Sequence, residues 1–165
     1  MKIQSLSQAI PFLGMPRNYA KIDNFVSRSA QPQKEDFIWL KEQGVTDVIN
    51  FRTMFVSAIN FEEEKTVKEL GMRYHNISTV TVKPSEEKVK TFLNLIDDII
   101  KNGGKAHIHC KAGADRTGMY AFIYKSVKNI GTLVENEKEW IAKGHDIIRY
   151  PDLRNWAKNF LKTIK

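Results

Sequence analysis

Apolar and polar residues follow one another along this chain in blocks that predict strands and helices in alternation. Short apolar runs at residues 24–29, 45–50, 72–77 and 105–109 are typical of strands buried in a sheet. Residues 85–101 predict a helix, because the apolar residues there recur every three or four positions: Val89, Phe92, Leu93, Ile96, Ile99 and Ile100. Strands that alternate with helices predict an α/β fold, with a central, mostly parallel sheet flanked by helices.

An earlier helix is predicted over residues 32–43. It stops at Gly44, because glycine readily adopts the left-handed backbone that follows a helix. The apolar residues Phe37, Ile38 and Leu40 are expected to face the core.

The second half of the chain ends in further helices. Thr132 and Glu135 form a capping box, which opens one of them. The last helix begins at Pro151. Trp140 and Trp156 occupy apolar positions of these two helices, and we expect both to lie in the core.

The composition fits a single domain that spans residues 1–165. Lys and Arg number 26, whereas Asp and Glu number 19, so the net charge is +7. That balance suits an anionic substrate, and no run of five like charges indicates a nucleic-acid-binding arm. The single cysteine excludes an internal disulfide framework and a multi-cysteine zinc site. We expect a monomer with no metal, no cofactor and no nucleic-acid partner.

The N-terminal region holds one candidate for a targeting segment. Residues 9–15 are apolar, but this stretch is short and contains Pro11 and Gly14. No stretch of the sequence is long enough for a transmembrane helix. We expect a cytoplasmic protein, with a secreted or periplasmic protein as the alternative, since a signal peptide removed beforehand leaves no trace.

Residues 107–118 carry the candidate chemistry. Cys110 ends a predicted strand, a helix begins near Thr117, and the short loop between them contains Gly113. Convergent backbone N–H groups at a helix N-terminus bind anions and favour the thiolate form of a nearby cysteine. Arg116 adds a planar guanidinium suited to bidentate binding of phosphate.

These groups predict phosphoryl transfer to sulfur. The thiolate of Cys110 attacks phosphorus, and the resulting phosphocysteine is hydrolysed by water. Thr117 can donate its hydroxyl to the sulfur, and Gly118 closes the loop. The phosphate is bound by the loop residues Lys111, Ala112, Gly113, Ala114, Asp115 and Arg116. The alternative is a buried structural cysteine followed by an ordinary helix start.

A histidine and a cysteine, His109 and Cys110, are followed after five residues by Arg116 and Thr117. This pattern resembles the signature of the cysteine-dependent protein tyrosine and dual-specificity phosphatase superfamily. The resemblance implies a protein tyrosine phosphatase-like fold and hydrolysis of phosphomonoesters without a metal. It also implies that His109 orients the loop and does not relay protons.

The resemblance extends beyond the loop, from about residue 18 to about residue 142. Residues 28–32, 44–45 and 48–52 are similar to the small dual-specificity-like phosphatases of bacteria. Within these stretches Arg52 is interpreted as structural, although it follows a strand and could face the pocket. His107, which shares a strand face with His109, is also interpreted as structural.

Two lysines bear on the substrate. The loop sequence resembles that of phosphoinositide phosphatases, in which the lysine after the cysteine meets additional phosphates, and Lys111 holds that position. Lys83 belongs to a loop that we expect to border the pocket. For each lysine the alternative is an ordinary solvated side chain.

The general acid departs from the family pattern. The family supplies an aspartate from a separate loop, but residues 78–84 of this chain contain no Asp, Glu or His. Asp115 is the internal candidate, and the myotubularin branch resembles this chain in placing an aspartate directly before the loop arginine. The alternative is that Asp115 only fixes the shape of the loop.

The leading function is therefore a cysteine-dependent phosphatase whose substrate is an inositol phosphate or a phosphoinositide. A phosphatase of phosphoproteins, mainly at phosphotyrosine, is the second hypothesis. A non-catalytic phosphate-binding module and a sulfur transferase of the rhodanese type are alternatives from other classes. An open basic pocket favours the first hypothesis, and a deep aromatic-walled slot favours the second.

Overall fold

The computed structural model describes residues 14–53 and 57–164, with the side chains of the second stretch given from residue 62 onward. A five-stranded sheet with the order β1-β2-β5-β3-β4 forms its centre. The strands are β1 (Ala20–Lys21), β2 (Val26–Ser29), β3 (Asp47–Asn50), β4 (Arg73–Asn76) and β5 (Ala106–His109). All neighbouring pairs are parallel except β1 with β2. The predicted α/β fold with a mostly parallel sheet is confirmed, while the short antiparallel β1 was not predicted.

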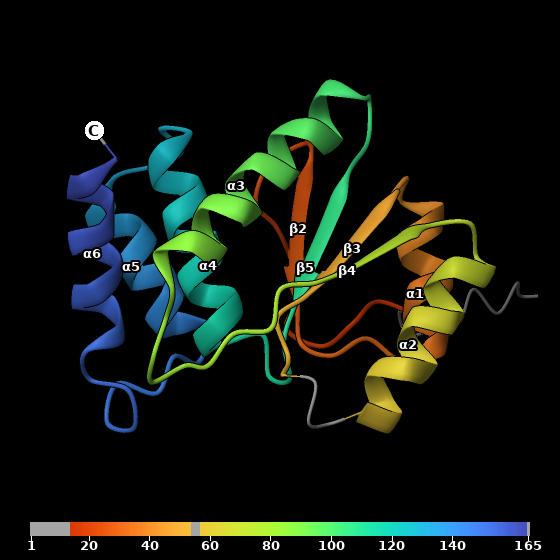
Figure 1. The fold of residues 1–165 in the computed structure, drawn as a ribbon, viewed down its shortest axis with the longest axis horizontal. Coiled ribbons are helices and arrows are strands. Elements are labelled where there is room, and N and C mark those ends of the chain that lie inside the picture. Colours follow the sequence, from red (N-terminus) through yellow and green to blue (C-terminus); the bar gives the residue numbers. More distant parts are fainter. Residues whose placement is uncertain (1–13, 54–56, 165) are drawn as a thin grey trace, which may run out of the picture.

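The helices cover both faces of the sheet (Figure 1). They are α1 (Lys34–Glu42), α2 (Ser57–Glu69), α3 (Glu86–Lys101), α4 (Asp115–Val127), α5 (Leu133–Ala142) and α6 (Leu153–Thr163). Helices α1 and α2 lie on one side, and α3 and α4 lie on the other, with α5 and α6 packed outside α4. The capping box of Thr132 and Glu135 opens α5 as predicted.

Each face of the sheet has its own core. Under α3, the helical spacing predicted from the sequence buries Val89, Phe92, Ile96 and Ile99. Under α1, Phe37 and Leu40 are buried, but the prediction for Ile38 was wrong, because its side chain is 42% exposed. Phe37 and Leu40 are three residues apart and share a helix face, whereas Ile38 is rotated about 100° from Phe37.

The parallel strands end together, and this edge of the sheet positions the site. Ser29 of β2 and Asn50 of β3 both pair in register with His109 of β5. The chain therefore leaves three neighbouring strands at one place, where ligands bind in open α/β sheets. No helix in the described part of the chain is long and apolar enough to cross a membrane.

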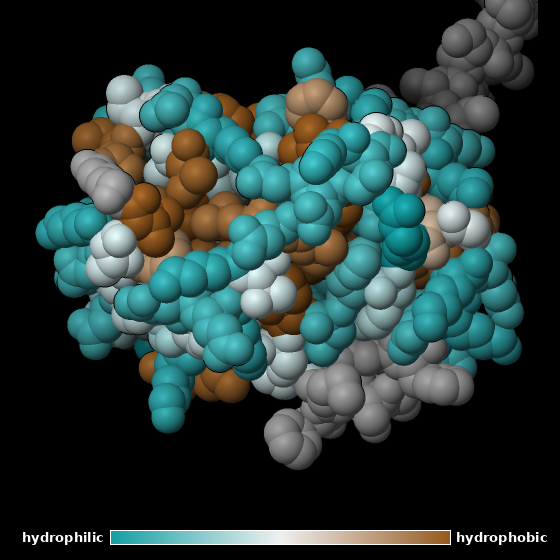
Figure 2. All heavy atoms as spheres, turned by 45° about the horizontal axis from the view of Figure 1, so that its top comes forward, coloured by the Kyte–Doolittle hydropathy of each residue, from teal (hydrophilic) through white to brown (hydrophobic). Residues whose placement is uncertain are grey.

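A large apolar hollow lies at the other end of α4. It has a volume of about 610 Å³ and is lined by Val127, Leu133, Leu161 and Ile164 among others. Figure 2 shows brown, apolar atoms gathered on this face beside the C-terminal helices. The 13 residues of α4 separate this hollow from Cys110 by on the order of 20 Å. The hollow is therefore not part of the candidate active site.

Candidate active site

Cys110 leaves β5 and enters a tight loop that leads into α4 at Asp115. Cys110 is buried, with only 3% of its surface exposed. Helix α4 begins two residues earlier than the sequence suggested, so its N-terminus follows the loop directly. The positive end of the helix dipole is thus directed at the space beside the sulfur.

Gly113 makes the loop possible. Its φ of +69° lies in the left-handed region, and a Cβ built on it comes within 2.5 Å of the backbone of Ser29 and Ala30. The loop therefore packs directly against the end of β2, at a distance that only glycine permits.

The carbonyl groups of the loop are held by the surrounding protein. Four successive carbonyls, those of residues 111–114, each accept a hydrogen bond from a donor outside the loop. Because the C=O and N–H of a planar trans peptide point in opposite directions, the following N–H groups face the other way, toward the anion site. The donors are Gln31 N to Lys111 at 3.0 Å, Asn18 Nδ2 to Ala112 at 3.2 Å, Arg28 Nη2 to Gly113 at 2.8 Å and Trp140 Nε1 to Ala114 at 3.1 Å.

Gly118 and Trp140 hold the loop in place from the side of α4. A Cβ on Gly118 would lie 2.1 Å from the Trp140 ring, so the indole packs directly against the first turn of α4. Trp140 is 1% exposed, which confirms its predicted place in the core, whereas Trp156 is only partly buried.

Arg28 is a functional candidate that the sequence analysis named within a resembling stretch but gave no role. The side chain is 1% exposed and lies beneath the loop, where Nη1 is 3.6 Å from Glu139 Oε1. Burial lowers the pKa of Arg28, while the charges of Glu139 and Cys110 act in the opposite direction. Because arginine remains protonated in proteins, a positive charge is held under the thiol.

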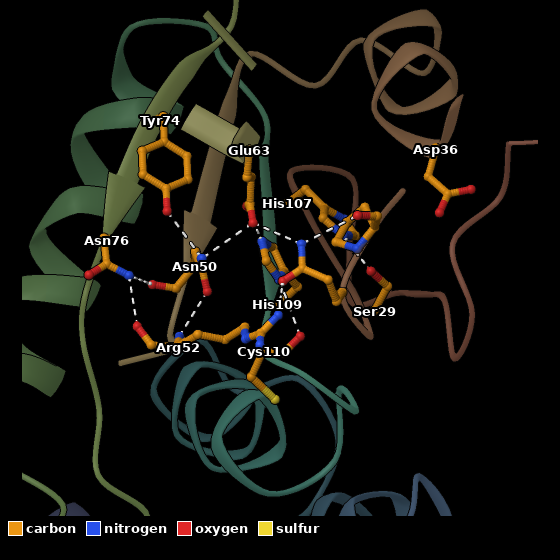
Figure 3. Close-up of polar contacts among 12 residues, drawn as sticks. Ser29, Asp36, Asn50, Arg52, Glu63, Tyr74, Asn76, His107, His109 and Cys110 are labelled. Carbon is orange, nitrogen blue, oxygen red and sulfur yellow. Dashed lines mark hydrogen bonds and ion pairs between the residues drawn. The ribbon is translucent and has the colours of Figure 1, made fainter. Parts of the chain in front are cut away.

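A buried carboxylate stands behind His109. Nε2 of His109 lies 2.5 Å from Oε1 of Glu63, and both side chains are almost fully buried (Figure 3). The other carboxylate oxygen of Glu63 accepts hydrogen bonds from Gln31 at 2.8 Å and Asn50 at 3.3 Å. Nδ1 of His109 lies 3.3 Å from the carbonyl oxygen of Cys110. The network thus connects α2 to the start of the loop.

The sequence pattern did not identify Glu63 as a site residue, because it belongs to a charged helix whose glutamates are expected to be solvated. One signal could have found it. Val67 lies four residues later and is fully buried, so Glu63 shares the inward face of α2.

His107 has the structural position predicted for it. Its ring is fully buried, with Nδ1 2.8 Å from the hydroxyl of Ser27 and Nε2 2.7 Å from that of Ser29. Burial and the neighbouring His109 keep the pKa of His107 well below its usual value, so the ring is neutral at pH 7.

Arg116 lies at the mouth of the site. Its side chain is half-buried, and Nη1 donates to the carbonyl oxygen of Phe51 at 3.4 Å. It borders an open hollow of about 230 Å³ beside the loop. The other lining residues are Thr53, Thr79, Val80, Thr81, Val82 and Tyr150.

The predicted contact from Thr117 to the sulfur is not made in this structure. The hydroxyl of Thr117 is buried and has no hydrogen-bond partner within the described residues. It lies in the first turn of α4, which leaves it close in the chain to the thiol but not bonded to it.

Asp115 is tethered to a segment far along the chain. Its Oδ1 lies 2.7 Å from Nδ1 of His145 and accepts the backbone N–H of Asp146 at 2.9 Å. His145 is 5% exposed and its ring lies against Trp140, with centroids 4.7 Å apart. His145 could not be identified from the sequence pattern, because it lies 30 positions after Asp115.

The remaining candidates divide between the rim and the interior. Lys111 and Lys83 are both exposed, and Lys83 follows the residues that line the hollow beside Arg116. Arg52 is buried, and its Nη1 donates to Oε1 of Gln31 at 2.8 Å, which supports the structural role we assigned to it.

A parallel sheet that presents a buried cysteine on a loop of inward-facing amides, with an arginine at the helix start, defines a cysteine-dependent phosphatase of the protein tyrosine phosphatase type. Comparison with known protein families leads to the same class. The family described as "Polymorphic toxin system, DSP-PTPase phosphatase" matches residues 24–125, more than half of the chain, and the chain belongs to this family. It is accordingly a phosphatase that hydrolyses phosphomonoesters.

Other proteins are similar to this chain in sequence or in structure. Tyrosine-protein phosphatase CDC14 of Candida albicans is 24% identical over 146 residues, which cover 79% of this chain and only 25% of that protein. A protein of Shewanella putrefaciens described as "Putative phosphatase (DUF442)" is 23% identical over 90% of this chain and 91% of its own, with a TM-score of 0.75. The core catalytic domain of the PP-IP phosphatase SIW14 of S. cerevisiae is 17% identical over 90% and 91%, with a TM-score of 0.71.

Proposed function

We propose that Cys110 is the nucleophile of this phosphatase and that Arg116 and the loop amides bind the transferring phosphoryl group. The sulfur attacks phosphorus, an S–P bond forms and the P–O bond to the leaving alcohol breaks. The positive charge of Arg28 and the dipole of α4 stabilise the thiolate before attack.

Asp115 carries the proton in both steps of this proposal. It protonates the leaving oxygen, and its carboxylate then takes a proton from the water that attacks the phosphocysteine. Orthophosphate leaves, and the thiolate is restored. Two observations support this role. Residues 78–84, which border the hollow, contain no Asp, Glu or His. Among the residues that the structure describes, Oδ2 of Asp115 makes no hydrogen bond, while Oδ1 is held in place by His145 and Asp146.

The substrate that the geometry supports best is an inositol phosphate or a phosphoinositide. The hollow beside Arg116 is open, and among the described residues that line it Tyr150 is the one aromatic side chain, which is unlike a deep aromatic slot for a phosphotyrosine ring. Lys111 is exposed on the loop itself, where a second phosphate of the substrate can reach it. The structural relative SIW14 is named as a PP-IP phosphatase, which agrees with this substrate class.

A phosphoprotein is the second candidate substrate, because the curated relative CDC14 is named as a tyrosine-protein phosphatase. The non-catalytic module and the sulfur transferase are set aside. Both Cys110 and Arg116 are present, and the family is one of phosphatases.

A phosphate-release panel tests the proposal. It compares inositol polyphosphates, phosphoinositides, phosphotyrosine peptides and an activated aryl phosphate. Cys110→Ser should abolish turnover on every substrate while it still binds a phosphate analogue, because serine has no adjacent base to activate it. Substantial hydrolysis by this variant would contradict the covalent mechanism.

Lys111→Ala separates the substrate classes. Its activity on inositol polyphosphates should fall about tenfold to a hundredfold more than its activity on the aryl phosphate, as expected from the loss of one charge-assisted contact. Lys101→Ala, at an exposed position at the far end of α3, is the matched control. Equal losses on both substrates would remove Lys111 as an argument for a polyphosphorylated ligand.

A further inference from the structure

The hydroxyl of Tyr120 is buried in the core and has no part in the proposed mechanism. Tyr120 lies on α4, four residues after Arg116, so the two side chains share one face of the helix. Tyr120 is 0% exposed, and burial raises its pKa to about 12, so the group is a neutral phenol at pH 7. A buried phenol needs a hydrogen-bond partner, and this partner lies on the loop that borders the active site.

Tyr120 donates its hydroxyl hydrogen to Thr79. The two oxygen atoms are 2.8 Å apart, and the hydroxyl of Thr79 donates its own hydrogen to the carbonyl oxygen of Ile77 at 2.8 Å. Because a threonine hydroxyl carries a single hydrogen, Tyr120 is the donor of this pair. Thr79 is 1% exposed and lines the hollow beside Arg116. Tyr120 therefore holds the first part of the loop of residues 78–84 in place.

The carbonyl oxygen of Phe51 joins Thr79 to Arg116. It accepts the backbone N–H of Thr79 at 3.1 Å and Nη1 of Arg116 at 3.4 Å. The backbone N–H of Phe51 donates to the carbonyl oxygen of His109, directly before Cys110, at 2.9 Å. One residue thus connects the strand end that carries the thiol with the guanidinium proposed to bind the phosphoryl group.

Tyr120 also holds the ring of Phe51. The two rings are stacked, with centroids 3.9 Å apart and planes 7° from parallel. The ring of Phe92 meets both of them edge to face, with centroids 5.6 Å from Phe51 and 4.9 Å from Tyr120. All three side chains are 0% exposed, so the close packing of the core restrains them. Tyr120 therefore restrains Phe51 directly through its ring and, by way of Thr79, through its hydroxyl.

This restraint determines which edge of the Arg116 guanidinium is presented to the substrate. A guanidinium grips two phosphate oxygens with two parallel N–H groups on one edge. Phe51 engages Nη1, and within the described residues the guanidinium makes no other hydrogen bond. The edge formed by Nε and Nη2 is therefore left for two phosphate oxygens. A shift of the Phe51 carbonyl group would turn this edge away.

We propose that Tyr120 and Thr79 are positioning residues for phosphoryl transfer, which act through the carbonyl group of Phe51 on the guanidinium of Arg116. This inference rests on the proposed function, in which Arg116 binds the transferring phosphoryl group, and adds the residues that aim it. The hydroxyl of Tyr120 acts without touching the substrate. Its contribution to turnover therefore exists only while a guanidinium is there to be aimed.

Steady-state kinetics on the activated aryl phosphate and denaturant unfolding test the inference. Tyr120→Phe keeps the stacked ring and removes only the hydroxyl. Its turnover should fall about threefold to tenfold, as expected from the loss of one neutral hydrogen bond. Thr79→Val should lower turnover to a similar extent. Thr79→Ser, which keeps the hydroxyl, should recover most of that loss.

Tyr124→Phe is the matched control. Tyr124 lies one turn further along α4, is 1% exposed and donates its hydroxyl to Oδ2 of Asp23 at 2.7 Å. It is eight residues from Arg116, which places it on the order of 12 Å along the helix axis. Both tyrosine variants should lower the denaturant midpoint, because each loses a buried hydrogen bond, but only Tyr120→Phe should lower turnover.

A double-mutant cycle with Arg116→Lys identifies the path of the effect. When combined with Arg116→Lys, Tyr120→Phe should lower turnover by less than about twofold further, because no planar fork remains to be aimed. Unchanged turnover of Tyr120→Phe, an equal loss in Tyr124→Phe, or a full loss in combination with Arg116→Lys would overturn the inference and leave the proposed phosphatase mechanism intact. Near-normal turnover of Arg116→Lys alone would instead refute the proposed role of Arg116, and the inference with it.

Discussion

The imidazole of His109 and the carboxylate of Glu63 form a buried pair whose nearest atoms are 2.5 Å apart, although 46 residues separate them in the chain. The side chains are 0% and 2% exposed, so water screens this interaction very little. His109 directly precedes the proposed nucleophile. The pair therefore fixes the end of β5 from which the phosphate loop departs.

Replacement of Glu63 by glutamine should destabilise this anchor. The new amide group must face either His109 Nε2 or the donors of Gln31 and Asn50, which already point at the carboxylate. With Nε2 of His109 protonated, one donor is then left opposite another donor, which costs about 1–3 kcal/mol in the free energy of unfolding. Denaturant unfolding measures the change, and turnover should fall with it.

Glu64→Gln is the control for that substitution. Glu64 is a half-exposed neighbour whose only described ion pair is with Lys68 on the same helix, so its replacement should change stability by less than about 0.5 kcal/mol. Equal effects of the two substitutions would mean that the buried pair is not an anchor.

Gly113→Ala should disrupt the loop much more than an ordinary glycine substitution. The added Cβ would meet the backbone of Ser29 and Ala30 at 2.5 Å, in addition to the cost of a left-handed alanine. Gly103 provides the matched control, because its φ is +77° and nothing lies within 4 Å of its Cβ position. Gly103→Ala should cost about 1–2 kcal/mol and keep turnover, whereas Gly113→Ala should lose both stability and turnover. Normal activity of Gly113→Ala would show that the loop can move away from β2.

The parts of the site that the sequence predicted are those encoded by neighbouring residues. Cys110, Gly113 and Arg116 lie within seven consecutive positions, so their relation to a strand end and a helix start can be read directly. The capping box of Thr132 and Glu135 is local in the same way.

Residues that reach the site through tertiary structure could not be predicted in this way. His145 approaches Asp115 only because α5 packs on α4, and Arg28 reaches the loop only because β2 pairs with β5. Charged residues such as Glu63 are usually solvated, so their burial is not expected from the residue type alone. It becomes understandable only once the buried partner, here His109, is known. The prediction that Ile38 is buried was wrong for the opposite reason, since hydrophobicity alone does not specify which helix face a residue occupies.

Arg116→Lys should lose most of the activity although the charge is kept. Lysine is a point charge and cannot form the planar fork that grips two phosphate oxygens. We expect turnover to fall about a hundredfold or more, as when one preorganised donor to a developing oxyanion is removed. Steady-state kinetics on the aryl phosphate measure the change. Near-normal turnover would mean that Arg116 does not contact the transferring phosphoryl group.

The proton donor can be identified by the leaving group. An alkyl leaving group such as an inositol hydroxyl needs a proton, whereas an activated aryl leaving group needs far less help. Asp115→Asn keeps the size of the side chain and an acceptor for His145 but removes the proton. If Asp115 is the acid, turnover on an alkyl phosphate should drop by about 10²–10⁴, and turnover on the aryl phosphate should drop much less.

Two further variants separate acid catalysis from loop shape. Tyr150 lines the hollow beside Arg116 and carries a phenolic proton there, so Tyr150→Phe should leave the ratio of alkyl to aryl turnover unchanged if Asp115 is the acid. His145→Ala removes the partner of Oδ1 at 2.7 Å and should lower both activities together, because it loosens the loop without removing the proton. His145→Asn, which keeps a donor near the position of Nδ1, should recover part of that loss. If Asp115→Asn lowers both activities equally, as His145→Ala does, then Asp115 shapes the loop and the proton comes from another group.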